Sequence, residues 1–281
     1  MDTFASDQFS PFHEGERAIQ EQLGVQDIEA WARKVVRSYL PDQHRAFYCS
    51  LPFLVVAARD GKGRPWATVL EGSEGFVTSG DPQQLTIHSG PPIGDALVGA
   101  LGTNSDIGIL GIEFDTRRRN RINGRVKENK NDGIEIFVDQ TFGNCPQYIR
   151  ERNWYRVDVN VPGVRKRRKR LSREQQNWIE IADTFFIATG YRGEGENPAF
   201  GMDASHRGGE KGFVRAISDT KLIYPDYAGN NHYNTIGNLL LDNKVGMLFV
   251  DFTTGSLLQL TGNASIDWNS SKIEQYPGAQ R

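Results

Sequence analysis

The chain has 281 residues, with 33 Lys+Arg against 35 Asp+Glu and a formal net charge of −2. This balance argues against a dedicated nucleic-acid-binding protein, which is usually strongly basic, and a hydrophobic fraction of 38% argues against general disorder. No apolar run reaches the roughly 20 residues that a membrane span needs, and residues 1–11 do not resemble a signal peptide, so we expect a cytoplasmic protein without membrane contact.

The predicted elements are helical at first and strand-forming later. Ile19 and Leu23 share one helix face before Gly24, and Asp27 can cap a second helix that ends before Pro41. After residue 52, short runs of β-branched and aromatic residues alternate with Gly, Pro and Asp. This pattern is typical of antiparallel strands that are joined by tight turns.

The strand pattern occurs twice along the chain. Residues 53–58 recur at 185–190 with an offset of 132, and residues 107–114 recur at 245–252 with an offset of 138. A spacing that drifts so little indicates an internal duplication, with two unrelated stretches of β patterning as the alternative. One helix is expected within each copy, at 93–101 and at 232–241.

A basic run, RKRRKR at 165–170, lies between the two copies. Such a run can bind RNA or serve as a nuclear localisation signal. In a chain of net charge −2 we interpret it instead as a solvated linker, and no nucleic-acid partner is expected. Ser172 and Gln175 follow as an S-x-x-Q capping box, which predicts the start of a helix.

The sequence lacks the commoner catalytic motifs. It has no G-x-x-x-x-G-K-[ST] phosphate loop, no H-E-x-x-H and no G-x-S-x-G. Its five histidines show no metal-ligand spacing, and Cys49 and Cys145 are too few for a four-thiolate zinc site. No metal site is therefore expected.

Two segments of the second copy indicate an anion site. Ser205, His206 and Arg207 place a hydroxyl, an imidazole and a guanidinium beside two glycines, which suits a phosphate, with a basic surface turn as the alternative. Downstream, a turn-forming stretch enters the expected second helix, so its free backbone amides would face an anion. The candidate residues of this stretch are Asp226, Tyr227, Asn230 and Asn231, and an asparagine cap explains the last two equally well.

Arginines of the first copy are further candidates. Arg119 and Arg121 alternate with Asn120 and Ile122 along a predicted strand, so the two arginines share a face, with solvated edge-strand charge as the alternative. The second copy reads LLQLTG (257–262) at the same place. At an offset of 133, Ser205, His206 and Arg207 correspond to Gly72, Ser73 and Glu74. An acidic residue would repel a dianion, so we expect one anionic-ligand site per chain.

Six segments together resemble the pyridoxamine 5′-phosphate oxidase-like, FMN-binding split-barrel proteins, specifically their tandem-barrel branch. The segments are FHEGERAIQEQLG (12–24), PDQHRAF (41–47), FGNCPQYI (142–149), ADTFFIAT (182–189), SHRGGEKGFVR (205–215) and LLQLTG (257–262). They occur in the order of the family, and the resemblance extends over nearly the whole chain.

The resemblance implies a mainly β (α+β) fold with two tandem six-stranded antiparallel split β-barrels, which pair within one chain around FMN. One helix would be inserted in each barrel. The expected parts are an N-terminal helical segment (1–45), a first split barrel (46–150), a linker and helix (151–182) and a second split barrel (183–281).

The resemblance also implies roles for the candidate residues. The FMN phosphate would be held by Ser205, His206, Arg207, Asp226, Tyr227, Asn230 and Asn231. Arg119 or Arg121 would supply positive charge near the flavin N1. Family members that oxidise pyridoxamine phosphate carry a Ser-Arg-Lys phosphate turn, whereas residues 229–232 here read GNNH, which argues against a vitamin B6 substrate.

We therefore expect a flavin-dependent oxidoreductase that acts on a small substrate, with NAD(P)H as a candidate electron donor. No catalytic side chain is assigned, because the cofactor supplies the redox chemistry. The alternatives are a flavin carrier or sensor without turnover, and a protein that binds nucleic acid or another partner through the basic run at 165–170. Pairing of two chains into a homodimer is left open.

Overall fold

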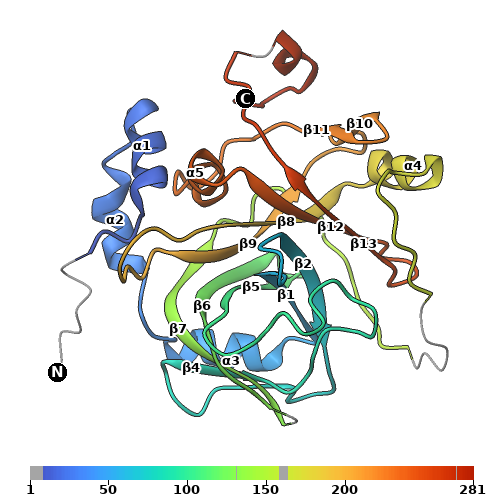
Figure 1. The fold of residues 1–281 in the computed structure, drawn as a ribbon. Helices are drawn as coiled ribbons and strands as arrows, with labels where there is room; N and C mark the ends of the chain where they lie inside the picture. Colours follow the sequence, from blue (N-terminus) through green and yellow to red (C-terminus); the bar gives the residue numbers. More distant parts are fainter. Residues whose placement is uncertain (1–8, 131, 158–163, 270) are drawn as a thin grey trace.

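The computed structural model describes residues 9–130, 132–157, 164–269 and 271–281 (Figure 1). The helices are α1 (Glu14–Gln22), α2 (Ile28–Val35), α3 (Asp42–Ser50), α4 (Arg173–Ile181), α5 (Asn234–Leu241) and the short 3-10 helix η2 (Ser271–Gln275). The strands before α4 are β1 (Phe53–Arg59), β2 (Pro65–Glu71), β3 (Val77–Thr78), β4 (Gln84–Ile87), β5 (Asp106–Glu113), β6 (Arg118–Lys130) and β7 (Gly133–Asn144). The strands after α4 are β8 (Thr184–Tyr191), β9 (Gly201–Gly208), β10 (Arg215–Ser218), β11 (Lys221–Ile223), β12 (Lys244–Val250) and β13 (Leu257–Asn263).

The chain is mainly β, as expected, and its sheets are antiparallel. The first sheet has seven strands in the order β2-β1-β5-β6-β7-β4-β3, and the second has four in the order β13-β12-β8-β9. The hairpin β10-β11 is separate from the second sheet. Within the described part of the chain neither sheet closes into a barrel, because the end strands of each sheet are not paired with each other.

The two sheets repeat the same strand order and register. Strands β6-β5-β1-β2 of the first sheet correspond to β13-β12-β8-β9 of the second. Gly108 lies opposite Asn123 in one sheet and Gly246 lies opposite Thr261 in the other, so both residues of the pair are shifted by 138. The offset of 138 predicted from the sequence is thus the offset of the strand register.

The offset of 132 predicted for the first strand of each copy is wrong by one residue. Ala57 lies opposite Gly108, and Ala188 lies opposite Gly246, which gives an offset of 131. A slip of one residue turns every side chain to the other face of a strand. The sequence could not show the slip, because both faces of β1 and β8 are buried and both strands read as continuous apolar runs.

The correspondence of Ser205, His206 and Arg207 with Gly72, Ser73 and Glu74 is also wrong. Ser205 lies opposite Ile187 on β8, and the residue in the same position of the first sheet is Thr68, opposite Val56 on β1. The following positions carry Val69 and Leu70. The turn between β8 and β9 is longer than the turn between β1 and β2, which shifts the alignment.

The sheets pack face to face (Figure 1). A shared apolar layer lies between them. The side chains of Val55 and Ala57 on β1 face this layer, whereas those of Leu54 and Val56 face the core of the first sheet, as the two-residue period of a strand requires. Gly108 lets the sheets approach closely, because a Cβ atom there would lie 2.5 Å from the carbonyl oxygen of Met202 on β9. The strands β5 and β9 are thereby held close together.

The predicted helices are confirmed in part. The capping box of α4 is present, since the Gln175 backbone N–H donates to Ser172 Oγ and the Ser172 backbone N–H donates to Gln175 Oε1. Helix α5 forms within the expected range 232–241. The helix predicted at 93–101 is wrong: the chain turns there, because Gly94 and Gly99 adopt positive φ angles of 87° and 76° that a helix excludes. In the described residues, no helix has the length and apolar character of a membrane span.

Candidate anion-binding site

All nine residues predicted for the site line one pocket between the two sheets. Arg119 and Arg121 come from β6, Ser205, His206 and Arg207 come from β9, and Asp226, Tyr227, Asn230 and Asn231 come from the segment that leads to α5. The cavity has a volume of about 100 Å³. Residues from both halves of the chain therefore meet at one place, which sequence spacing alone could not establish.

Arg121 is held rigidly in the wall of the pocket. Its Nη1 donates to Asp203 Oδ1 at 3.1 Å and to Asn234 Oδ1 at 2.9 Å, and its Nη2 donates to Ser205 Oγ at 2.5 Å. Burial lowers the pKa of Arg121, and the carboxylate of Asp203 opposes that change. Asp203 is fixed in turn by Asn238 Nδ2 at 2.6 Å. The charge of Arg121 is thus compensated by a buried partner.

Arg119 has no such compensation. Its Nε donates to the carbonyl oxygen of Cys145 at 2.9 Å, and it forms no ion pair within the described residues. Burial, followed by repulsion from Arg121 and Arg207, lowers its pKa to about 10. The guanidinium remains protonated at neutral pH. It therefore contributes a positive charge that the surrounding protein does not neutralise.

His206 lies behind Arg119 and is fully buried. Burial, and then the positive charges of Arg119 and Arg207, hold its pKa well below the ordinary value, so the ring is neutral. Its Nδ1 lies 3.3 Å from Arg119 Nη1 and must accept this hydrogen bond, which we take to place the ring proton on Nε2. His206 thus orients the guanidinium of Arg119. It adds no positive charge to the pocket.

Arg207 and Asp226 face each other across the pocket. Arg207 Nη2 lies 3.9 Å from Asp226 Oδ1, and Arg281 Nη2 lies 2.9 Å from Asp226 Oδ2. A carboxylate repels a phosphate, so Asp226 can position the guanidinium but cannot itself hold an anion. The pocket lining contains three guanidinium groups and this one carboxylate.

The start of α5 adds backbone donors. Asn231 and Tyr233 adopt left-handed φ angles of 60° and 57°, and the N-cap Tyr233 makes no capping bond with its side chain. The first backbone bond of the helix runs from the Gly237 N–H to the Tyr233 carbonyl at 2.7 Å. The amides of the first turn precede this bond, so they are open to a ligand at the positive end of the helix dipole.

The remaining predicted residues shape the wall. Asn230 Nδ2 donates to Asn144 Oδ1 at 3.1 Å, and Asn230 Oδ1 accepts from the His232 backbone N–H at 3.2 Å. Asn230 therefore caps a turn before the helix, which matches the alternative interpretation. The ring of Tyr227 stacks on that of Tyr148 with centroids 5.2 Å apart.

Several lining residues were missed by the sequence analysis. They include Asn144 at the end of β7, Cys145, Gln147 and Tyr148 after it, and Asn234, Thr235 and Ile236 in the first turn of α5. The first group lies in the segment FGNCPQYI, which was used for the family resemblance but not for the site. Asn234 and Thr235 could have been predicted, because the backbone amides in the first turn of a helix are open to an anion. No spacing signal linked the segment after β7 to β9.

The arrangement is suited to a small dianion such as a phosphate monoester. Buried Arg121 Nε, Arg207 Nε and Asn144 Nδ2 have no hydrogen-bond partner within the described residues. The cavity is smaller than the roughly 300 Å³ at which ligand pockets usually begin, so it suits a small group such as a phosphate. The described residues contain no group of three His, Cys, Asp or Glu side chains placed to hold a metal ion.

Comparisons with known proteins do not add to this description. No family model matches the chain, and neither the curated proteins nor the solved structures contain a match to it.

Proposed function

We propose that this chain binds FMN, with the FMN phosphate in the pocket between β6, β9 and α5, and acts as a flavin-dependent oxidoreductase. The observation that carries the proposal is the gathering of three arginines and an open helix N-terminus around one cavity. The fold would be a pair of tandem split barrels, and the repeated strand order and register of the two sheets support it.

The donor set fits a phosphate group. Guanidinium groups make forked, charge-assisted hydrogen bonds to phosphate oxygens, and backbone amides at a helix start add further donors. Arg119 carries the uncompensated charge, and Arg121 is fixed by Asp203 and Ser205. The neutral ring of His206 keeps Arg119 directed along the pocket.

The bound flavin would supply hydride or electron transfer to a small substrate. The residues of this chain would bind the phosphate and orient it, and Arg119 would add positive charge next to the ligand. We assign no role in proton transfer to His206, because it is buried and neutral. A flavin carrier without turnover would use the same pocket, and steady-state oxidation of NAD(P)H with an added acceptor separates the two functions.

Replacing Arg119 with alanine tests the phosphate site. Arg119 has no carboxylate partner, so its removal leaves no buried charge unpaired. Loss of a charge-assisted hydrogen bond costs about 1.5 to 3 kcal/mol, which corresponds to about 10- to 150-fold weaker FMN binding. The measurement is a titration of FMN by fluorescence quenching.

Arg118→Ala is the matched control. Arg118 lies on the same strand, its guanidinium packs over the Phe47 ring, and it does not line the pocket. We expect FMN affinity within about twofold of the unmodified chain for this variant, in line with the small effect of a substitution outside the site. Equal affinity of the Arg119 and Arg118 variants would show that FMN, if bound, lies elsewhere.

A further inference from the structure

The edge of the second sheet differs from the same edge of the first. In the first sheet β6 pairs with β5 on one side and with β7 on the other, and β7 also pairs with β4. In the second sheet β13 pairs with β12 alone, and β11 pairs with β10 alone. Among the described residues, no strand takes the place of β7 between β13 and β11.

The free edge of β13 exposes a regular set of backbone groups. Asp251 N–H donates to the Ser256 carbonyl, and Ala264 N–H donates to the Asn243 carbonyl, which fixes the alternation of the β12–β13 ladder. By this alternation the backbone groups of Leu257, Gln259, Thr261 and Asn263 point away from β12. In the first sheet, the positions of Leu257, Gln259 and Thr261 are taken by Arg119, Arg121 and Asn123, at an offset of 138. Those three residues lie opposite residues of β7.

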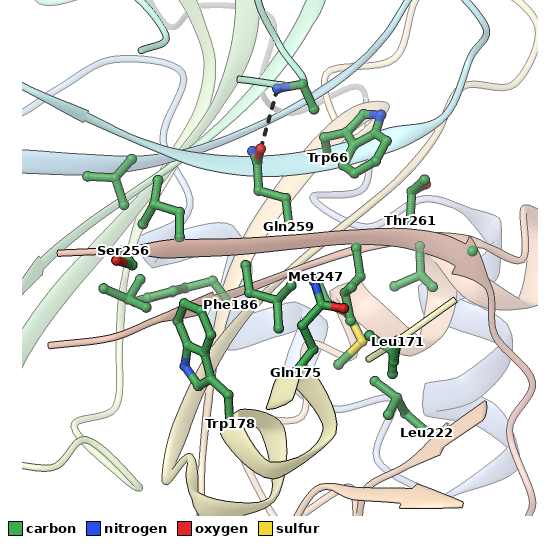
Figure 2. Close-up of a pocket in the computed structure, with 18 of the residues that line it drawn as sticks. Trp66, Leu171, Gln175, Trp178, Phe186, Leu222, Met247, Ser256, Gln259 and Thr261 are labelled. Carbon is green, nitrogen blue, oxygen red and sulfur yellow. Dashed lines mark hydrogen bonds between the residues drawn. The ribbon is translucent and has the colours of Figure 1, made fainter. Parts of the chain in front are cut away.

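A groove runs between β13, α4 and β11 (Figure 2). Trp178 and Gln175 on α4, Leu222 on β11 and Met247 on β12 lie around the same space as β13. Apolar side chains that are only partly buried surround it. They are Leu171, Trp178, Leu222, Tyr224, Leu260, Ala264 and Ile266. An added strand would cover part of this surface.

The groove is also positively charged. Its described lining contains twelve Lys and Arg side chains, including the whole run 165–170, against six Asp and Glu side chains. Within that run only Arg170 forms an ion pair with a described residue, Asp219, at 3.0 Å. In a chain of net charge −2, this concentration of positive charge favours an acidic partner.

We propose that this groove binds an extended peptide strand with alternating apolar side chains and acidic residues, which adds antiparallel to the free edge of β13. The strand β7 is the model for the occupant, because it fills the same place in the first sheet and carries two carboxylates, Glu135 and Asp139. Backbone pairing gives such strand addition its affinity, and the side-chain pockets give it specificity. This inference is independent of FMN binding.

The chain segment after β11 already accepts antiparallel pairing of this kind. Asp226 N–H donates to the Arg281 carbonyl at 2.8 Å, and Gln280 N–H donates to the Asp226 carbonyl at 2.8 Å. The backbone at Asp226 is therefore already paired, so the added strand is proposed to pair with β13.

The experiment uses a synthetic peptide with the sequence GIEIFVDQTFGN, which is that of β7. Binding to the 281-residue chain is followed by Trp fluorescence, and the contact is located by hydrogen–deuterium exchange of residues 257–263. We expect protection of β13 amides that face the free edge, and weaker binding as the salt concentration rises. A peptide with Lys in place of its Glu and Asp should bind more weakly.

Thr261→Pro and Thr261→Ala form the matched pair of variants. Proline removes an edge N–H that makes no bond to β12, so β12–β13 pairing is kept, whereas alanine retains the N–H. We expect about tenfold weaker peptide binding for Thr261→Pro and less than about twofold for Thr261→Ala, with similar melting temperatures. Equal affinities for the two variants, or unchanged exchange of β13, would overturn the proposal. Dimerisation of the chain through β13, seen by sedimentation, would overturn it as well, since a second copy would then occupy the groove.

Discussion

The two sheets repeat one strand arrangement but enclose different cores. Twenty-one buried residues form the core of the first sheet, with two partly buried apolar residues beside them. The core of the second sheet has ten buried residues and nine partly buried ones. The first core is covered by β7 and by α3, whose Phe47 and Tyr48 belong to it. The comparison shows that the same strand arrangement buries its apolar face more fully where further elements, β7 and α3 among them, cover it.

The same comparison gives a reason for placing the proposed anion site on one side only. Arg121 on β6 reaches across the sheet interface to Ser205 on β9. Gln259 occupies the corresponding position on β13 and reaches across to β2, where its Nε2 donates to the Ala67 carbonyl at 2.8 Å. Both side chains span the interface, but only one of them carries a charge.

The largest predicted effect is a loss of stability on truncating an apolar side chain, compared between corresponding positions of the two cores. Ile122 on β6 is fully buried, whereas Leu260 on β13 is partly buried. Ile122→Ala should lower the free energy of unfolding by about 4 kcal/mol, because it leaves a cavity in a closed core. Leu260→Ala should lower it by only about 1 kcal/mol, since less apolar surface leaves water at that site. Chemical denaturation measures both values, and equal losses would contradict the described difference between the cores.

The second prediction concerns pH and the anchoring of α5, which has no helical counterpart in the first copy. His232 packs against the rings of Phe12, Trp31 and Phe142 at 5.2, 5.7 and 5.3 Å. Burial lowers the pKa of His232 from 6.5 to about 4. Between these two pH values His232 is therefore protonated in the unfolded chain and neutral in the folded chain. Stability should therefore be highest above pH 6.5 and should fall as the pH drops toward 4, by about 3 kcal/mol from this group.

His232→Phe should remove that part of the pH dependence while it keeps an aromatic ring in place. The measurement is urea denaturation of both proteins at pH 7 and near pH 4. A variant that loses as much stability as the unmodified chain would show that His232 does not titrate in this way.

The smallest predicted effect concerns the close approach of the sheets. Gly108→Ala should cost about 2 kcal/mol, because its Cβ would lie 2.5 Å from the Met202 carbonyl and the backbone would have to move. Gly61→Ala is the control, since no atom lies within 4 Å of a Cβ there. Thermal unfolding of the two variants measures the difference. A control as unstable as Gly108→Ala would argue against tight packing at the interface.

The sequence predicted the mainly β class, the helix α5 and the offset of 138, because the glycines and aliphatic residues of β5 and β12 alternate in the same way. The nine candidate residues that it indicated line one pocket. It failed at residues 93–101, where Gly94 and Gly99 override an apolar pattern. It also failed in the alignment of β1 with β8, since strands buried on both faces give no periodic signal. The role of Asn144 and Tyr148 depends on tertiary contacts that no local pattern records.

The measurement that tests the account most directly is the flavin content of the chain. The purified protein is mixed with excess FMN and separated from free flavin by gel filtration, and the visible absorption of the protein fraction is compared with its concentration. The account predicts one FMN per chain, and little retained flavin for Arg119→Ala. Retention of no flavin by the unmodified chain, or of equal amounts by the Arg119 variant, would contradict it.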